Sequence, residues 1–408
     1  MLIYIHVPFC KSKCHYCAFN SWVPESGETQ AYLSGVLAEI ELWPGRIGRK
    51  EVSTIFVGGG TPSTLPAAAI GAMLDRVAAC FRLRPDLEVT VEANPQSGRE
   101  IRYYHDLLRA GVNRLSLGVQ SLNDEMLALL NRPHTASDAA RALHQAREAG
   151  FTNINLDLMW GLPGQRLRKW KEDLLHVIAQ LRPEHISTYG LAIEPETPFN
   201  AWNDAGKLHF CGERELWHMF IDGAEILEEA GYLQYEISNF AKLGFQCKHN
   251  LGYWEGEDYL GFGPGAVSTI DGRRWTNPHD LTSFLEMVES GAVPGGKYGE
   301  LEELSAETRL MEEIMLALRT KKGFQAGIYR KVTGRDFFKE NQLLFNSLYA
   351  QGLIRIRNGR LSLTRGGMLV SNTVMTHIFN SLPALNGGES AIPAPSPAIK
   401  AAASRGEE

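Results

Sequence analysis

The sequence predicts an α/β protein in which a partial (β/α)6 barrel is followed by a smaller α+β, winged-helix-like domain. The barrel is indicated by strand-like and helix-like segments that alternate six times within about the first 230 residues. Such alternation is typical of a parallel sheet covered by helices. A doubly wound sheet would give the same pattern, although six units rather than eight favour a barrel that is open on one side. The second domain is indicated by a change of rhythm after about residue 235, where helices and a small hairpin replace the alternation.

Short apolar and β-branched runs predict the strands of the barrel, and a helical period follows each of them. The expected strands are 2–7, 52–57, 87–93, 114–119, 154–159 and 185–191. The expected helices are 28–42, 65–80, 99–110, 124–130, 137–149, 169–181 and 212–230, with Gly150 as a C-cap. Polar, glycine-rich segments follow the carboxyl ends of the strands, and folds of this kind build their sites there.

The second half of the chain has a different pattern. Segment 236–265 is rich in Gly, Asn and aromatic residues with little periodicity, so we expect an ordered loop. A helix is expected from Ser305 onward and another at 336–349, and Asn358-Gly359 between two short β-like runs signals a hairpin. The end of the chain is small, polar and rich in Pro and Ala, which is typical of disorder. We therefore expect four parts: a barrel at 1–235, a connecting segment at 236–300, the winged-helix-like domain at 301–381 and a disordered tail at 382–408.

Composition and charge describe an ordinary globular chain. Of 408 residues, 44% are hydrophobic and 22% are charged, and the formal net charge is −6. The 41 basic residues are scattered, which gives no electrostatic support for a nucleic-acid partner. No stretch approaches the roughly 20 apolar residues of a membrane span, and the N-terminus resembles no targeting segment. We therefore expect a soluble, cytoplasmic protein whose contact with membranes is at most peripheral.

Three of the six cysteines lie together in the loop after the first strand, at the spacing Cys10-x3-Cys14-x2-Cys17. Clustered thiols in a reducing compartment are more often metal-binding or catalytic than cross-linked. A structural zinc site would need a fourth ligand, for which His6 or His15 would have to serve. A redox dithiol would leave the third cysteine unexplained, and inert thiols are the remaining alternative. We favour an iron–sulfur cluster, in which three ligands for four irons leave one iron open for a small molecule.

The cysteine spacing resembles the signature of the radical S-adenosylmethionine (SAM) superfamily, whose fold is a partial (β/α)6 barrel. Further runs extend the resemblance over most of residues 2–380 to the HemN/HemW branch: YIHVPFC at 4–10, GGGTPSTL at 58–65, VEANP at 91–95, RLSLGVQS at 114–121 and DLMWGLPGQ at 157–165. The resemblance implies a [4Fe–4S] cluster on Cys10, Cys14 and Cys17, with the amino and carboxylate groups of SAM on the open iron. An electron from such a cluster cleaves SAM to a 5′-deoxyadenosyl radical, so the cofactors carry the chemistry and the protein holds them.

Several positions near strand ends are candidates for holding SAM. Glu92 and Asp157 are flanked by apolar strand residues, which favours an ammonium or ribose partner, or else an internal ion pair with Arg114 or another basic residue. Gln120 can donate to and accept from a ribose, and Arg132 can clamp a carboxylate unless it is a solvated residue at a helix end. The resemblance implies further contacts at the glycine loop, which by itself would be a tight turn, and at two tyrosines: Gly59, Gly60, Thr61, Tyr4 and Tyr16.

Two departures separate the chain from the oxygen-independent coproporphyrinogen III dehydrogenases of the HemN/HemW branch. Those enzymes resemble CxxxCxxCxC, whereas Phe19 stands here two residues after Cys17, as in the CxxxCxxCxF form of the heme chaperones of that branch. They also carry a long N-terminal arm, whereas nine residues precede Cys10 here. We therefore expect a chaperone that binds heme, a [4Fe–4S] cluster and SAM and transfers heme to an acceptor protein. The alternatives are oxidative decarboxylation of coproporphyrinogen III and a radical enzyme with another substrate.

Residues 249–254 read HNLGYW and resemble the HNxxYW motif of the same heme chaperones. A histidine beside two large aromatic residues can ligate and sandwich a porphyrin iron, which makes His249 the candidate heme ligand. The alternative for His249 is a hydrogen-bonded packing residue. Cys247 is a rival or accessory ligand, unless it is a small buried hydrophobe. The winged-helix-like end lacks a basic recognition helix, so we expect it to dock an acceptor protein or the second subunit of a homodimer rather than nucleic acid.

Overall fold

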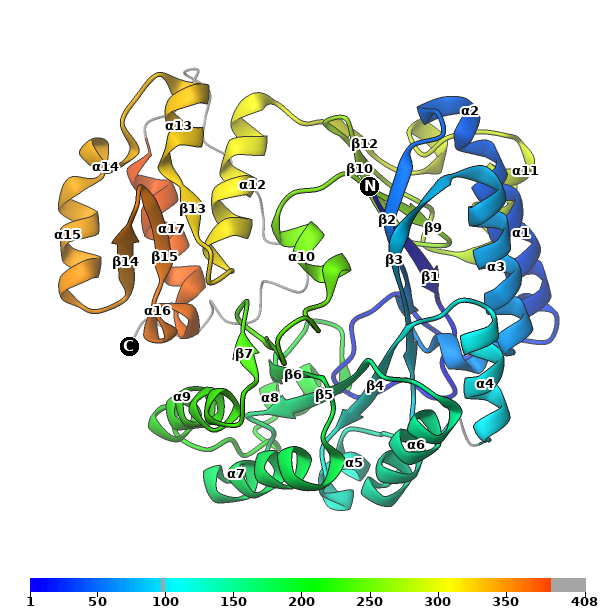
Figure 1. Cartoon of the computed structure of the whole chain (residues 1–408), viewed down its shortest axis with the longest axis horizontal. Helices are drawn as coiled ribbons and strands as arrows, with labels where there is room; N and C mark the ends of the chain where they lie inside the picture. Colours follow the sequence, from blue (N-terminus) through cyan, green and yellow to red (C-terminus); the bar gives the residue numbers. More distant parts are fainter. Residues whose placement is uncertain (97–99, 383–408) are drawn as a thin grey trace.

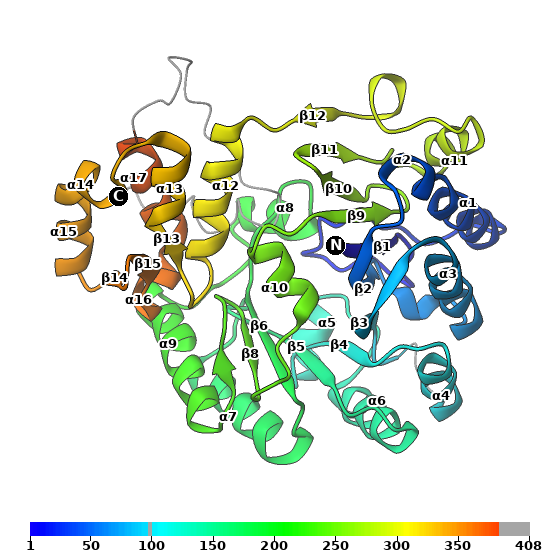
Figure 2. The ribbon, with the colours of Figure 1, turned by 45° about the horizontal axis from the view of Figure 1, so that its top comes forward.

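The computed structural model describes residues 1–96 and 100–382. Six parallel strands lie side by side in sequence order at the centre of one curved sheet. They are β1 (Leu2–Val7), β2 (Glu51–Gly59), β3 (Arg82–Ala93), β4 (Arg114–Gln120), β5 (Ile154–Trp160) and β6 (His185–Gly190). Helices cover the outer face of this sheet (Figure 1, Figure 2): α1 (Glu28–Leu42), α2 (Pro44–Ile47), α3 (Ala67–Cys80), α4 (Ile101–Arg109), α6 (Ala136–Ala149), α7 (Leu167–His176) and α9 (Glu213–Glu229). This arrangement confirms the predicted α/β fold with a partial (β/α)6 barrel.

Successive side chains of a strand point to opposite faces of the sheet, and in the barrel strands one face is apolar while the other carries polar residues. In β5, Leu156 and Leu158 belong to the main hydrophobic core, whereas Asp157 between them lines a central pocket. In β3, Val91 and Glu92 divide in the same way. The apolar face therefore packs under the helices, while the polar face is left for a ligand inside the barrel.

The expectation of an ordered loop at 236–265 is wrong, because this segment adds strands to both edges of the sheet. On one edge, β8 pairs antiparallel with β6; on the other, β9 pairs parallel with β1, and the completed sheet has twelve strands. Strands of two to four residues are too short for periodicity to reveal. Within this segment lie β8 (Asn239–Ala241), α10 (Lys248–Trp254) and β9 (Tyr259–Phe262). Before and after it lie β7 (Leu233–Gln234), β10 (Val267–Ile270), β11 (Arg273–Thr276), α11 (Leu281–Glu289) and β12 (Leu301–Glu303).

The C-terminal part is built around a second hydrophobic core, which Phe220 of α9 also joins, and it has the helix and strand order of a winged helix. Its elements are α12 (Ala306–Leu318), β13 (Phe324–Gln325), α13 (Ala326–Thr333), α14 (Phe337–Glu340), α15 (Gln342–Ala350), β14 (Ile354–Arg357), β15 (Arg360–Leu363), α16 (Arg365–Leu369) and α17 (Ser371–Ser381). Asn358 and Gly359 have φ angles of 52° and 71°, which confirms the two-residue hairpin turn. The helix expected at 336–349 is interrupted at Asn341, whose side-chain amide donates to the carbonyl of Phe337 at 2.8 Å.

The expected disordered tail lies outside the described residues, apart from its first residue, and the boundaries expected for the four parts stay predictions. Within residues 1–96 and 100–382, no helix is long and apolar enough to cross a membrane.

Candidate cofactor-binding site

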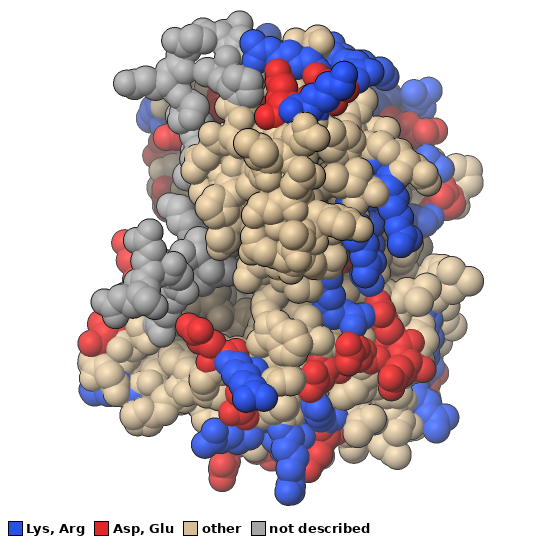
Figure 3. Space-filling view, turned by 90° about the vertical axis from the view of Figure 1, so that its left-hand side faces the viewer, with Lys and Arg blue, Asp and Glu red and all other residues tan. Residues whose placement is uncertain are grey.

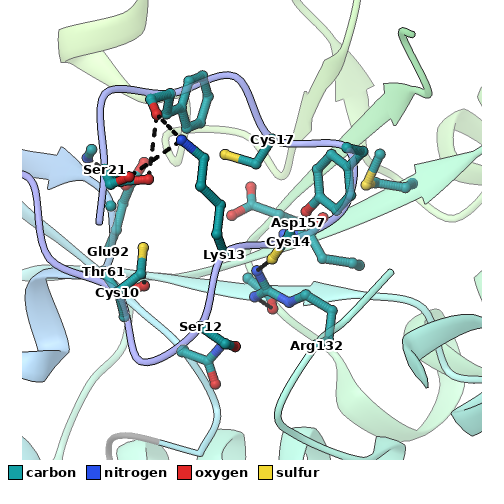
Figure 4. A pocket seen from close by; sticks show the side chains of 18 of the residues that line it. Cys10, Ser12, Lys13, Cys14, Cys17, Ser21, Thr61, Glu92, Arg132 and Asp157 are labelled. Carbon is teal, nitrogen blue, oxygen red and sulfur yellow. Dashed lines mark hydrogen bonds between the residues drawn. The ribbon is translucent and has the colours of Figure 1, made fainter. Parts of the chain in front are cut away.

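A pocket of about 390 Å³ opens at the carboxyl ends of the parallel strands, and the cysteine loop after β1 forms one of its walls. The loop is fixed by backbone contacts. The amide of His15 donates to the carbonyl of Leu130, just after α5 (Asp124–Leu129), at 3.2 Å. Lys13 Nζ crosses the loop and donates to the carbonyls of Phe19 and Ser21, each at 3.2 Å (Figure 4). These contacts hold the thiols in place without regular secondary structure.

The three predicted cluster ligands, Cys10, Cys14 and Cys17, all line this pocket (Figure 4). In the described part of the chain, no three His, Cys, Asp or Glu side chains converge tightly enough for a single metal ion. Three thiols on one pocket wall suit a cluster, in which each thiolate binds a different iron. His6 and His15, which a zinc site would have needed, bond to backbone carbonyls instead. Burial raises the pKa of Cys17 to about 11, so a soft cation is needed to hold this group as a thiolate.

The glycine loop after β2 brings bare backbone to the pocket wall. Gly59 has a φ of 111°, and its amide donates to Glu92 Oε2 at 3.1 Å. A Cβ on Gly60 would lie 2.8 Å from the backbone carbonyl oxygen of Phe9, in the loop after β1, so only glycine lets the two loops approach this closely. Thr61 Oγ1 lies 3.5 Å from Cys10 Sγ. The positions predicted to lie beside the methionine end of SAM are therefore adjacent to a predicted cluster ligand.

Glu92 and Asp157 both line the pocket without an ion-pair partner in the described part of the chain. Ser116 Oγ donates to Asp157 Oδ2 at 3.2 Å, and Asn155 Nδ2 donates to Asp157 Oδ1 at 2.7 Å. Arg114 acts on the two carboxyl groups only through its charge. Burial, together with the charge of Asp157, raises the pKa of Glu92 to about 8, and burial raises the pKa of Asp157. A ligand that brings a cation and hydroxyl groups would stabilise both carboxylates.

Arg132 lies inside the pocket, so the alternative of a solvated arginine at a helix end is wrong. Its Nη2 donates to the carbonyl of Gly118 at 2.6 Å, and its Nη1 lies 3.4 Å from Cys14 Sγ. Its Nε is buried without a hydrogen-bond partner. Gln120, on the same wall, has a φ of 65° where a bulge interrupts the pairing of β4 with β5. A residue with a side chain is uncommon in this region of backbone space, and such strain is frequent at binding sites.

Tyr16 lines the pocket beside the thiols, whereas Tyr4 and His249 do not reach it. The hydroxyl of Tyr4 bonds to a neighbouring histidine ring at 3.0 Å. His249 is 2% exposed; its Nδ1 bonds to Thr54 Oγ1 at 2.7 Å, and its Nε2 has no partner. Cys247 is also buried. The structure therefore places His249 as a buried, hydrogen-bonded residue, and its role as a heme ligand stays a prediction.

Sequence reasoning missed other residues that line the pocket: Lys13, Ser116, Gly118, Met159 and Tyr189. For Ser116 and Gly118 a signal existed, because they alternate with leucines in the run RLSLGVQS and share the face of Gln120. For Lys13 no signal existed, because the path of a loop does not follow from periodicity.

Comparison with known proteins agrees with this geometry. The profile of the Radical SAM superfamily matches residues 4–177, and the profile of the HemN C-terminal domain matches residues 304–370. The solved structure of coproporphyrinogen III oxidase (HemN) from Escherichia coli, a radical SAM enzyme, matches with a TM-score of 0.78 at 26% identity, over 93% of this chain and 90% of that one. The chain is therefore a radical SAM protein with a HemN-type C-terminal domain. A [4Fe–4S] cluster and SAM are the cofactors of this superfamily, and the residues of the pocket fit both.

Relatives narrow this class further. Heme chaperone HemW from Bacillus subtilis (strain 168) is 36% identical over 382 residues, which are 93% of this chain and 99% of the relative. Heme chaperone HemW from Escherichia coli (strain K12) is 44% identical over 294 residues, which are 70% of this chain and 75% of the relative. The chain belongs to the HemW heme chaperone family, which confirms the resemblance found in the sequence.

Proposed function

We propose that this protein binds heme, holds a [4Fe–4S] cluster together with SAM, and transfers heme to an acceptor protein. Relatives that are 33%, 36% and 44% identical to it are named heme chaperones, which supports the heme-binding part. Cys10, Cys14 and Cys17 would hold the cluster, with Tyr16 beside it. When bound, the cluster and SAM supply one-electron chemistry, while the side chains of the pocket hold them and limit the access of water.

The pocket residues suit different parts of SAM. The bare backbone at 59–61 leaves room for the methionine end, and Glu92 would lose its proton to pair with the amine. Arg132 can clamp the carboxylate of the methionine moiety. Gln120 and Asp157 can bond to the ribose hydroxyls. Tyr4 lies outside the pocket lining, so it would act on SAM only through the residues in front of it.

Phe19 is the residue that favours a chaperone over a dehydrogenase. It lines the pocket at the position where the dehydrogenase pattern has a fourth cysteine, and it is 61% exposed. A phenyl ring cannot ligate a metal, whereas an exposed aromatic at a pocket mouth offers a surface for a flat apolar ligand. The alternative function, oxidative decarboxylation of coproporphyrinogen III, is supported by the fold shared with HemN.

Two measurements on reconstituted protein test this proposal. Purified protein titrated with heme should retain it and show a Soret band. Anaerobic incubation with coproporphyrinogen III, SAM and a reductant should yield no protoporphyrinogen at enzymatic rates. Decarboxylation at such rates would replace the chaperone with the dehydrogenase, and failure to retain heme would contradict the chaperone independently.

His249 stays the candidate heme ligand, with Cys247 as its rival. The free Nε2 of His249 is available for a bond, but its burial means that α10 must move away from Thr54 before heme can reach it. In His249→Ala, loss of the Soret band with unchanged cluster content would support ligation. An unchanged Soret band would assign His249 to packing, and Cys247→Ala then tests the rival ligand.

We expect an acceptor protein or a second subunit to dock on the outer face of the C-terminal domain. Helix α15 contains no charged residue, and Leu343 and Tyr349 on it are 87% and 64% exposed. Figure 3 shows a broad uncharged area on this side of the molecule, with basic side chains along one border. Arg355 and Arg357 of the adjacent β14 are also exposed. An uncharged helix offers nucleic acid no phosphate contacts, whereas an apolar centre with a charged rim is typical of protein interfaces.

Leu343→Glu tests this surface by sedimentation velocity and heme titration. If the surface is a dimer interface, the variant should sediment as a monomer at concentrations where the wild-type protein is dimeric. Heme retention by Leu343→Glu should stay unchanged whether the surface docks a second subunit or an acceptor protein, because the surface is separate from the pocket. The cytoplasmic location and a membrane contact that is at most peripheral, both expected from the sequence, stay predictions.

A further inference from the structure

Helix α10, which carries the HNxxYW motif, packs across the strands of the barrel beneath the pocket. Glu88 of β3 accepts hydrogen bonds from the backbone amides of Lys248 and His249, both at 3.0 Å. His249 also bonds to Thr54 of β2. Glu88 precedes Glu92 by four residues on β3, and alternate residues of a strand share a face. Helix α10 therefore contacts a layer of inward-facing side chains that lies two such layers below the one that lines the pocket. The motif is therefore part of the inside of the barrel.

Hydrogen bonds join this layer to Asp157 in the pocket. The hydroxyl of Tyr235 lies 2.8 Å from His185 Nε2, and His185 Nδ1 lies 2.6 Å from Asn155 Oδ1. Asn155 Nδ2 lies 2.7 Å from Asp157 Oδ1. At the other end, Asn250 of the motif donates from Nδ2 to the Tyr235 oxygen at 3.4 Å, the longest link.

The direction of every bond follows from the chemistry of the two ends. A carboxylate only accepts, so Asn155 presents its NH2 group to Asp157 and its oxygen to His185. His185 therefore donates from Nδ1. Burial lowers the pKa of His185 well below its ordinary value, so the ring is neutral and accepts at Nε2 from the hydroxyl of Tyr235. All donors point toward Asp157, and aligned hydrogen bonds polarise and strengthen one another.

Tyr235 is also a junction between the barrel and the C-terminal domain. Its carbonyl accepts from the amide of Lys321, just after α12, at 3.0 Å, and the amide of Ile237 donates to the carbonyl of Arg319 at 3.1 Å. The backbone of Tyr235, whose hydroxyl begins the series of hydrogen bonds, is therefore held by contacts to the C-terminal domain. A side chain fixed in this way loses little further freedom when it holds its neighbours in place.

We propose that Tyr235, His185 and Asn155 are positioning residues for SAM binding, and that the HNxxYW helix braces them from within the barrel. The inference rests on the proposed role of Asp157 as a SAM contact. The hydrogen bonds through Tyr235, His185 and Asn155 orient the Asp157 carboxylate and stabilise its ionised form. Its remaining lone pairs then face the pocket, ready to accept from ribose hydroxyls. Without these hydrogen bonds, Asp157 keeps the bond from Ser116 to Oδ2 but Oδ1 is held less firmly, so the carboxyl group takes up a proton more readily and SAM binds more weakly.

Tyr235→Phe is the sharpest test, because it removes one hydroxyl and keeps the ring. Tyr232→Phe is the matched control, since that buried hydroxyl donates to the carbonyl of Pro183 at 2.8 Å, outside the chain. SAM affinity is read from the change that SAM causes in the EPR spectrum of the reduced cluster, alongside iron and sulfide content. Tyr235→Phe should weaken SAM binding by about three- to tenfold, the effect of one net hydrogen bond, with full cluster content. Tyr232→Phe should leave SAM affinity unchanged.

A second pair of variants covers the case in which Tyr235→Phe fails to fold. In His185→Gln the amide can still donate toward Asn155, so this variant should retain more SAM affinity than His185→Leu. Equal SAM affinity in wild type and Tyr235→Phe would overturn the inference, as would loss of heme retention with SAM affinity intact. Absence of SAM binding in the wild-type protein would instead overturn the proposed function along with it, so the two failures are distinguishable.

Discussion

Glu92→Gln is expected to make the cofactor-free protein more stable while it weakens SAM binding. Burial and the nearby Asp157 raise the pKa of Glu92 from 4.5 to about 8. Below pH 4.5 the folded and unfolded chains both carry the proton, so the substitution gains nothing there. Between pH 4.5 and about 8 only the folded chain keeps it, so raising the pH destabilises the wild-type fold. Glutamine carries no charge at any pH and avoids this loss.

The magnitude follows from the pKa. Each pH unit in this window removes about 1.4 kcal/mol from the free energy of unfolding of the wild-type protein. Over the whole window, from pH 4.5 to about 8, the difference approaches a ceiling of about 5 kcal/mol, and relaxation of the pocket and entry of water reduce it. Glutamine can still accept the hydrogen bond from the amide of Gly59 through its side-chain oxygen, so no contact is lost.

Thermal or urea unfolding of apoprotein at pH 5, 6, 7 and 8 measures this difference. The melting temperature of Glu92→Gln should rise above that of the wild type progressively as the pH increases. Glu39→Gln is the control: burial raises its pKa to about 8 as well, and its carboxylate accepts from Gly263 and Asn277 away from the pocket. It should show a similar pH trend but normal SAM affinity. A stability difference for Glu92→Gln that does not change between pH 5 and 8 would refute the reasoning.

Three further predictions test the pocket. Cys17→Ala should abolish the cluster absorbance of reconstituted protein while Cys211→Ala, outside the pocket, preserves it; a cluster that survives in Cys17→Ala contradicts the ligand set. Gly60→Ala should destabilise the fold by about 1–3 kcal/mol in thermal melts. Gly45→Ala is the control and should be neutral, because no atom lies within 4 Å of the added carbon. Equal melting temperatures of the two variants would disprove the close approach of the two loops at Gly60. Arg132→Lys should weaken SAM binding by about tenfold, because an ammonium cannot replace the planar fork of donors; an unchanged affinity in a SAM titration would remove Arg132 from the site.

The sequence predicts long, regular elements well and short edge strands poorly. The strand at 2–7 and the helix at 28–42 match β1 and α1, because each contains enough residues for its period to show. The strands between 239 and 303 have three or four residues, and several gain their hydrogen bonds from partners far away in sequence, such as Leu2 opposite Tyr259. Pairing between distant segments is a property of the folded chain and leaves no local pattern. The hairpin of β10 and β11 is different, because its turn at Asp271-Gly272, with φ angles of 50° and 80°, is a local signal that sequence reasoning missed.

The candidate site shows the same limit at the level of single residues. Periodicity reveals the face on which a strand residue lies, but it does not reveal the layer. In the register of β1 with β2, Val7 lies opposite Gly59, while Tyr4 lies opposite Phe56, three positions further from the pocket. Tyr4 therefore stands below the pocket wall. The cysteines were accessible to sequence reasoning because their spacing places all three in one loop, independent of any register.

The pocket is shaped for a charged ligand at the expense of the free protein. Glu92 and Asp157 have no cation partner among residues 1–96 and 100–382, and Gln120 is strained, so all three destabilise the folded chain. A site that bound only heme, a flat and mostly apolar ring, would gain nothing from Glu92 and Asp157 deep inside the barrel. SAM brings an ammonium and ribose hydroxyls, which would stabilise both carboxylates at once. The two carboxyl groups therefore support SAM binding independently of the cysteine motif.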